Sequence, residues 1–247
     1  MSLLLESILA PIYENGYSAS FYSWINTAAF IVFLAFAFWY GTKFKLKKLH
    51  ILIISVAMYA LMCGWMMVLC WMENGFENFG RKNLIVSFVY IPLIAYPIAK
   101  IFKLQWKLVC DFFAPGACIL LSLGRWGCIF EGCCRGVECS WGLYNPIIQT
   151  IVFPFQIFES VAAAIIALLL ILLARQKKYS SNGLSLPIMY ILLGSCRFLL
   201  EFFTDDEKVL FNFSSSALHA LFMMIVGLIA LFVIARSNCK TYGEELL

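Results

Sequence analysis

Long apolar stretches separated by short polar connections dominate this chain of 247 residues. Seven stretches approach the length of about 20 residues that an α-helix needs to cross the hydrocarbon core of a bilayer. They are residues 21–40, 49–71, 84–102, 108–124, 151–174, 184–203 and 217–235. Prolines interrupt the third and fourth stretches, where we expect helices to kink or end. The pattern predicts an all-α integral membrane protein with seven transmembrane helices.

The composition supports a membrane protein and sets its organisation. Hydrophobic residues make up 63% of the chain and charged residues only 13%, against about 25% charged residues in soluble domains. The connections are too short for an independent core, so we expect one polytopic membrane domain over residues 1–247. Residues 1–20 carry no lysine or arginine, which argues against a cleavable signal peptide and favours an interfacial segment. Residues 125–150 form an irregular connection rich in glycine and cysteine, which we expect to carry the site.

The basic residues predict the orientation. Twelve of the 18 lysines and arginines fall on one side of the seven-span arrangement. They are Lys43, Lys45, Lys47, Lys48, Lys100, Lys103, Lys107, Arg175, Lys177, Lys178, Arg236 and Lys240. Because positive loops stay in the cytoplasm, we expect the N-terminus outside and the C-terminus in the cytoplasm. The net charge of +4 needs no nucleic acid partner, since the chain has no compact basic face with a DNA or RNA motif.

Glycines surround an arginine at the outer end of the fourth stretch. They are Gly124, Gly127, Gly132 and Gly136, and Arg125 follows the first of them. Glycine lets backbone amides approach a ligand closely, and the forked donors of arginine suit a phosphate. The alternative is that Arg125 only anchors the helix end among the lipid headgroups.

Further charges lie inside apolar stretches, where an unpaired charge is costly. Arg197 and Glu201 stand four residues apart, so on a helix they share a face and can pair. The pair is either structural or holds an anionic lipid headgroup. Gln156 and Glu159 also share a face, and a buried Glu159 needs a cation, for which Arg125 or Arg135 is suited.

Four of the ten cysteines lie in the predicted outer connection: Cys128, Cys133, Cys134 and Cys139. Thiolates bind zinc or iron–sulfur clusters, but this spacing lacks the usual C-x2-C pairs. An outward-facing position favours disulfides instead. We therefore favour disulfides or thiols over a metal, and we expect structural roles for His50 and His219. The chain has no nucleotide-binding loop and no zinc-protease motif, so neither cofactor nor metal is predicted.

Five ordered motifs resemble one family. They are Asp111-Phe112-Phe113-Ala114-Pro115, Gly124-Arg125-x-Gly127, the pair Gly132 and Gly136, Pro154-x-Gln156-x-x-Glu159, and Arg197-Phe198-x-x-Glu201. Their order and spacing are similar to those of prolipoprotein diacylglyceryl transferases. These are seven-span bacterial enzymes that move diacylglycerol from phosphatidylglycerol onto a lipoprotein cysteine. The resemblance covers roughly residues 99–227.

The resemblance implies roles for these residues. Arg125 and Arg197 would bind the donor phosphate as catalytic residues, with Glu201 beside them and Glu159 in support. The four glycines and Gln156 would complete the substrate site. The implied partners are phosphatidylglycerol and a prolipoprotein or other thiol acceptor, in the bacterial plasma membrane.

The chain departs from the family pattern at several positions. Cys128 and Cys133 stand where the family has asparagine and glutamate, and Phe153 and Thr204 where it has histidine and arginine. The family histidine expected near residues 85–89 is also absent. Three functions therefore stay open: a diacylglyceryl transferase or a close variant with another acceptor, a lipid-binding or transport protein that has lost catalysis, and a membrane thiol-redox or metal protein.

Overall fold

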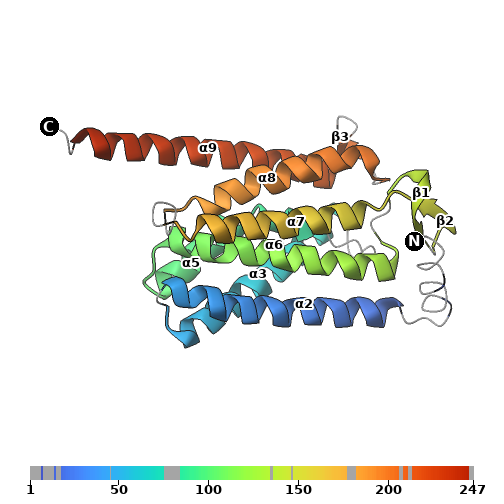
Figure 1. Cartoon of the computed structure of the whole chain (residues 1–247), viewed down its shortest axis with the longest axis horizontal. Coiled ribbons are helices and arrows are strands. Elements are labelled where there is room, and N and C mark those ends of the chain that lie inside the picture. The colour runs from blue at the N-terminus through green and yellow to red at the C-terminus, as the bar shows by residue number, and fades with distance from the viewer. Residues whose placement is uncertain are drawn as a thin grey trace.

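The computed structural model describes residues 7, 14, 18–44, 46–74, 84–133, 136–145, 147–176, 182–205, 208–210 and 213–244. Within them, six helices are long and apolar enough to cross a membrane. These are α2 (Ser18–Gly41), α3 (Lys48–Asn74), α6 (Trp106–Glu131), α7 (Phe155–Leu173), α8 (Ser185–Leu200) and α9 (Ser215–Glu244). They pack as one elongated bundle, from which the carboxyl end of α9 projects (Figure 1). The chain is therefore a multi-pass, predominantly helical membrane protein. Most of the predicted interfacial segment, namely residues 1–6, 8–13 and 15–17, lies outside the described residues.

The third predicted stretch is not one continuous helix. It forms α4 (Leu84–Phe88) and α5 (Ile91–Ile101), separated by a turn at residues 89–90. Pro92 lies in the first turn of α5, where a missing N–H is tolerated. The carbonyls of Phe88 and Val89 accept hydrogen bonds of 2.6 and 3.0 Å from the Tyr190 hydroxyl on α8. The predicted break is confirmed before Pro92, whereas Pro97 lies inside α5 and does not end it. A distant side chain satisfies the carbonyls at the break.

The fourth predicted stretch continues farther than we expected. Pro115 does not end α6, which runs on to Glu131 and includes Arg125 and Cys128. It stops at Gly132, whose φ of 68° is the left-handed conformation that glycine adopts readily at helix ends. The first part of the predicted outer connection is thus helical, and the assignment of residues 125–131 to an irregular segment was wrong.

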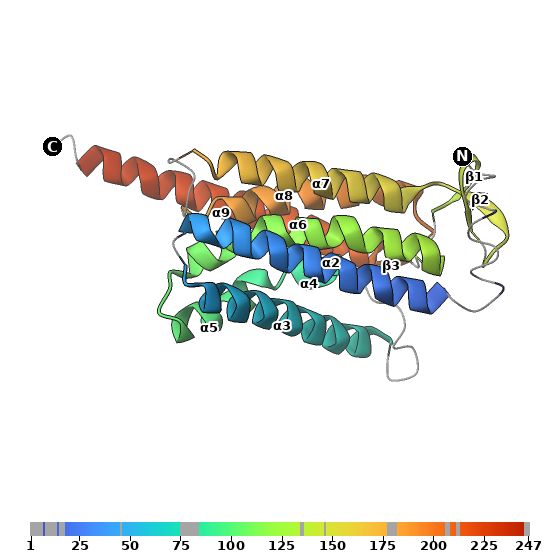
Figure 2. The ribbon, with the colours of Figure 1, turned by 60° about the horizontal axis from the view of Figure 1, so that its bottom comes forward.

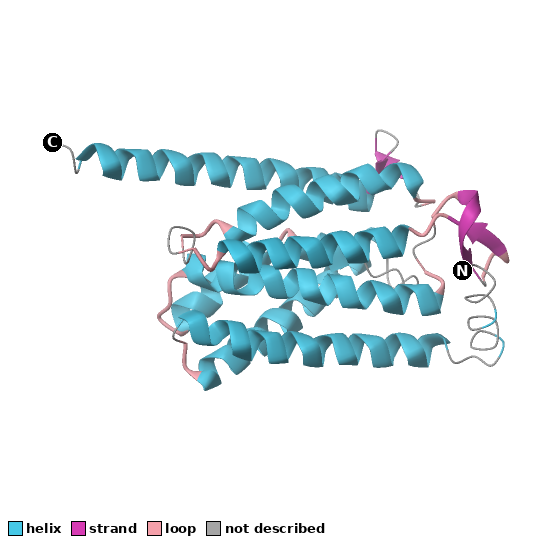
Figure 3. Ribbon diagram, viewed as in Figure 1, coloured by secondary structure: helices cyan, strands magenta, loops and turns pink. Residues whose placement is uncertain are grey.

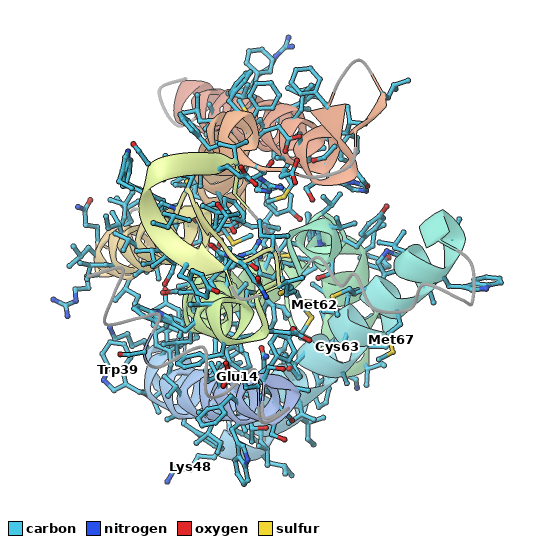
Figure 4. The ribbon with its side chains drawn as sticks, turned by 90° about the vertical axis from the view of Figure 1, so that its right-hand side faces the viewer. Glu14, Trp39, Lys48, Met62, Cys63 and Met67 are labelled. Atoms are coloured by element: carbon cyan, nitrogen blue, oxygen red, sulfur yellow. The ribbon has the colours of Figure 1, made fainter. Side chains whose placement is uncertain are left out.

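Helix α6 lies at the centre of the bundle. Of its most apolar 18-residue window, 72% is buried, against 17% for the window of α2 and 22% for that of α9. Figure 2 shows α6 between α7 on one side and α2 and α3 on the other. The labelled side chains in Figure 4 illustrate the two faces of α3, because Met62 is buried whereas Met67 is 41% exposed. The exposed apolar side chains of the outer helices suit contact with lipid.

All strands gather at one end of the bundle (Figure 3). The antiparallel pair β1 (Glu138–Asn145) and β2 (Thr150–Val152) follows α6 and crosses this end in Figure 4. The 3-10 helix η3 (Glu201–Phe203) follows α8. A second antiparallel pair, β3 (Lys208–Leu210) and β4 (Phe213–Ser214), lies between η3 and α9 in the chain. The Val137 amide donates a hydrogen bond of 3.0 Å to the Phe203 carbonyl, which ties the segment after α6 to η3.

The opposite end holds the basic connections. The 3-10 helix η1 (Thr42–Phe44) joins α2 to α3 there. Lys100 lies in the last turn of α5, Lys103 between α5 and α6, and Lys107 in the first turn of α6. Asp111 of α6 is buried at this end and accepts backbone bonds of 2.7 Å from Gly183 and 2.8 Å from Ser185. It thereby satisfies N–H groups at the start of α8, where helix donors need an acceptor. The motif that begins at Asp111 thus fixes the start of the helix that carries Arg197.

Candidate active site

Arg125 of α6 is buried near the end that carries the strands. Its side chain is 7% exposed, and its Nε forms an ion pair with Glu159 Oε2 on α7. Glu159 is fully buried. The partner that the sequence required for Glu159 is therefore Arg125, while Arg135 lies outside the described residues. The pair joins α6 to α7, beside a second link in which Ser160 Oγ donates a 2.7 Å bond to the Ser122 carbonyl.

Arg197 of α8 is 1% exposed, and its Nη2 lies 3.6 Å from Glu201 Oε2. The predicted pairing across one helical turn is therefore confirmed. Glu201 also accepts a bond of 2.9 Å from the Ser214 amide and one of 2.8 Å from the Ser214 hydroxyl. The Ser214 hydroxyl oxygen in turn accepts the Ala217 amide at 3.2 Å, as an N-cap of α9 does. Glu201 thus connects Arg197 to the start of α9.

A single aromatic ring lies beside both arginines. The ring centroid of Phe155 is 5.4 Å from Arg125 Cζ and 5.0 Å from Arg197 Cζ. Phe155 is the first residue of α7 and is 1% exposed. The separation of the two guanidinium carbons cannot exceed the sum of these two distances. The arginines from α6 and α8 therefore lie on the same ring inside the protein, and both are buried.

Hydrogen bonds hold the segment that leaves α6. Gln156 Nε2 donates to the Cys133 carbonyl at 3.1 Å, and Asn145 Nδ2 donates to the Gly132 carbonyl at 3.0 Å. Gln156 and Asn145 are both buried. The predicted substrate-site residue Gln156 thus holds the backbone just after the end of α6.

The predicted glycines serve close packing within the chain. A Cβ at Gly127 would lie 3.0 Å from the Tyr22 ring of α2, and one at Gly124 would lie 3.4 Å from Asn26 Oδ1. Small residues allow such close approach between membrane helices. At Gly136 a Cβ would overlap the Phe153 carbonyl oxygen. Gly132 ends α6, so each of the four glycines has a use in the fold besides any contact with substrate.

Three of the four outer cysteines can be placed. Cys128 lies on α6, where Arg125 Nη1 approaches its sulfur at 3.9 Å, and Cys133 follows the end of that helix. Cys139 lies on β1 and donates to the Trp141 carbonyl. These three are thiols in the structure, and Cys134 lies outside the described residues. In the described part of the chain, no group of three or more His, Cys, Asp or Glu side chains is arranged to hold a metal ion.

A cavity of about 460 Å³ lies between α2 and α3. Its lining residues are Tyr22, Ser23, Asn26, Thr27, Phe30 and Tyr59. Tyr22 and Asn26 are also the residues that approach Gly127 and Gly124. The cavity therefore adjoins the α2-facing side of the Gly124–Gly127 turn, and neither Arg125 nor Arg197 lines it.

Several residues of the site were not anticipated from the sequence. Phe155, Asn145 and Ser214 are buried contacts of the predicted side chains. Ser214 belongs to a run of three serines before an apolar stretch, a pattern typical of a helix start, and that signal could have identified it as a cap. Phe155 has no such signal, because one phenylalanine in an apolar segment looks like any core residue.

The two ion pairs together leave the buried cluster formally neutral. Guanidinium groups offer planar, forked donors that match the oxygens of a phosphate. Such groups, fixed in a water-poor site, stabilise negative charge that develops during a reaction. The two guanidinium groups are therefore suited to bind an anionic group.

Comparisons with known proteins agree with the ordered motifs. The family model for prolipoprotein diacylglyceryl transferase matches residues 12–233. Phosphatidylglycerol--prolipoprotein diacylglyceryl transferase 2 of Clostridium perfringens (strain 13 / Type A) is 24% identical over 180 residues, which are 69% of this chain and 69% of that protein. The phosphatidylglycerol--prolipoprotein diacylglyceryl transferase of Clostridioides difficile (strain 630) is 26% identical over 156 residues, covering 62% of this chain and 61% of the relative.

A third relative carries the same name as the second. The phosphatidylglycerol--prolipoprotein diacylglyceryl transferase of Streptococcus uberis (strain ATCC BAA-854 / 0140J) is 30% identical over 143 residues, which are 55% of each chain. The alignments with the second and third relatives thus span less than two thirds of those proteins. The family match covers far more than half of this sequence and confirms the resemblance read from its motifs. The chain belongs to the prolipoprotein diacylglyceryl transferase family.

Proposed function

We propose that this protein transfers the diacylglyceryl group of phosphatidylglycerol to the cysteine thiol of a prolipoprotein. The acceptor thiol gives up its proton, which ends on the departing glycerol phosphate. The thiolate sulfur attacks the carbon of the diacylglyceryl unit that is bonded to the phosphate oxygen. A carbon–sulfur bond forms while the carbon–oxygen bond breaks. The electron pair of the broken bond leaves on glycerol phosphate, so negative charge collects on the phosphate as the reaction proceeds.

One observation carries the proposal: two buried guanidinium groups from different helices converge on the Phe155 ring. Arg125 and Arg197 would bind the phosphate of the donor and stabilise the charge that the leaving group gains. Glu159 and Glu201 would hold these arginines in place, because each carboxylate pairs with one of them. The names of the relatives supply the donor and the acceptor.

The membrane arrangement that we propose has seven spans, with α4 and α5 together forming the third. The site end would face outward and the basic end would face the cytoplasm, in a bacterial plasma membrane. One observation supports this orientation. Lys100, Lys103 and Lys107 lie where α5 ends and α6 begins, at the end of the bundle away from the strands, and basic connections remain cytoplasmic. Residues 1–247 would form a single membrane domain.

The test uses purified protein, vesicles that contain phosphatidylglycerol, and a lipobox peptide with one cysteine. We expect release of glycerol phosphate together with a peptide mass increased by one diacylglyceryl group. Arg125→Ala and Arg197→Ala should each lower the rate by about 100-fold or more, as expected when a fixed donor to a developing oxyanion is lost. Arg175→Ala is the matched control, since Arg175 follows α7 at the opposite end. A parent protein without turnover, or arginine variants as fast as the control, would refute the transferase proposal.

The second candidate function is phospholipid binding without catalysis. Phe153 favours it, because this residue occupies a position where the resemblance leads us to expect histidine. Its ring stacks on Phe203 at 4.7 Å and on Phe158 at 5.1 Å and carries no titratable group. Binding of phosphatidylglycerol that requires Arg125 and Arg197, without turnover of any thiol acceptor, would support this candidate over the transferase.

A further inference from the structure

We propose that Phe155 is a positioning residue, whose ring holds both phosphate-binding guanidinium groups by cation–π attraction. The proposal rests on the proposed function, in which Arg125 and Arg197 bind the donor phosphate. It goes beyond that function by assigning the geometry of the arginine pair to an apolar side chain. The ring centroid lies within about 6 Å of both guanidinium carbons, which is the range of a significant cation–π contact.

The backbone fixes the position of this ring. Phe155 begins α7 directly after Pro154, and its amide donates a 2.8 Å bond to the Phe153 carbonyl. Gln156, the next residue, is tied to the Cys133 carbonyl at 3.1 Å. The side chain is 1% exposed, so the surrounding protein leaves it little freedom to move. The ring is therefore held in one position, in contact with an arginine of α6 and an arginine of α8.

The electrostatics explain the use of an aromatic ring here. Two like charges brought together in a medium of low dielectric constant repel each other strongly. The carboxylates reduce this cost from two sides, since Glu159 lies on α7 and Glu201 at the end of α8. The negative face of an aromatic ring attracts both cations as well. It does so without a formal charge, so it does not compete with a phosphate as a third carboxylate would.

An aliphatic residue of similar size would fill the space without this attraction. The two guanidinium groups would keep their carboxylates but lose the attraction of the ring, and the Glu201 carboxylate also accepts hydrogen bonds from Ser214. The lost attraction weakens binding of the donor and, because the phosphate gains charge in the transition state, also slows the chemical step. A fall in both kcat and 1/KM distinguishes this role from simple space filling.

The experiment replaces Phe155 by 4-fluoro-, 3,5-difluoro- and 3,4,5-trifluorophenylalanine in the full-length protein. Each fluorine weakens the negative face of the ring and changes its size little. We expect kcat/KM for phosphatidylglycerol to fall stepwise with the number of fluorines, and Phe155→Leu to lower it by roughly 30-fold, as for one desolvated cation–π contact. The same series at Phe113 is the matched control, because Phe113 is fully buried in the core and packs edge-on against Phe33.

A second measurement separates this proposal from the proposed function. Binding of phosphatidylglycerol is titrated in nanodiscs for every variant, and thermal unfolding is recorded in parallel. If the parent is active and neither turnover nor binding falls along the Phe155 series, the positioning role is refuted while the transferase stands. If the parent shows no turnover but its binding falls stepwise with fluorination, the transferase fails while the role of the ring is supported. A decline of the same size in the Phe113 series would also overturn the proposal.

Discussion

Replacing Glu201 by glutamine tests whether its charge stabilises the fold around Arg197. The Glu201 residue is 2% exposed, and several donors surround its carboxylate. They include Arg197 Nη2 at 3.6 Å, the Ser214 amide at 2.9 Å, the Ser214 hydroxyl at 2.8 Å and the Thr204 hydroxyl at 3.4 Å. Glu201→Gln keeps the size of the side chain and removes its charge. The change therefore isolates the ion pair from packing.

The magnitude follows from the contacts. Removing one partner of a buried ion pair costs about 3–5 kcal/mol, because the other charge stays buried. The glutamine oxygen can still accept the Ser214 amide, and its NH2 group can donate to the Ser214 hydroxyl oxygen. Most of the hydrogen bonding is thus retained, and we expect a loss of about 3 kcal/mol in the free energy of unfolding, the lower end of that range.

The assay is reversible unfolding in mixed micelles of dodecyl maltoside and SDS, followed by far-UV circular dichroism. Ser214→Ala serves as the comparison, since it leaves the charge pair intact while it removes the hydroxyl donor to Glu201 and the acceptor of the Ala217 amide. It should cost about 2 kcal/mol, roughly 1 kcal/mol for the hydrogen bond to Glu201 and roughly 1 kcal/mol for the lost N-cap. A Glu201→Gln protein as stable as the parent, or less damaged than Ser214→Ala, would show that the ion pair does not stabilise this region.

Three further predictions concern other parts of the structure. Asp111→Asn should lower the free energy of unfolding by about 1–3 kcal/mol, because the NH2 group of asparagine would replace one acceptor oxygen and face the amide of Gly183 or Ser185, which also donates. The same micelle assay checks this, and an unchanged stability would contradict it. Gly136→Ala should cost about 1–3 kcal/mol by overpacking against the Phe153 carbonyl, and faster hydrogen exchange at Val137 should accompany the loss. Cys128→Ser should retain transfer in the lipobox peptide assay, since serine also offers Arg125 an acceptor atom; loss of transfer would instead favour a chemical role for this thiol.

The long helices could be predicted because their signal is local. A run of about 20 apolar residues suffices for a membrane span, whatever surrounds it. The end of α6 could not be placed in the same way. Gly124 and Gly127 indicate a loop by composition, yet in the structure they allow close approach of α2. Whether a glycine ends a helix or packs against a neighbouring one depends on tertiary contacts, which the residues themselves do not specify.

In the site, too, contacts within one helix could be predicted and contacts between helices could not. The pair Arg197–Glu201 follows from a spacing of four residues on one helix. For Glu159 the sequence left two possible partners, Arg125 and Arg135. A buried carboxylate needs a nearby cation, but the sequence does not show which one the fold brings close. The contacts of Phe155 depend on how α6 and α8 pack against α7. No pattern within its own segment distinguishes it from the other phenylalanines of the chain.

The ionisable groups of the site also hold the bundle together. Arg125 and Glu159 connect α6 to α7, while Glu201 connects Arg197 to Ser214 at the start of α9. Each charge is buried beside an opposite charge, so losing any one of them leaves its partner uncompensated and destabilises the fold. The same four side chains therefore set both donor binding and stability in our proposal. For a variant at any of these side chains, a loss of donor binding can be told from a loss of stability only when the rate is expressed per folded molecule. Unfolding must therefore be measured together with turnover.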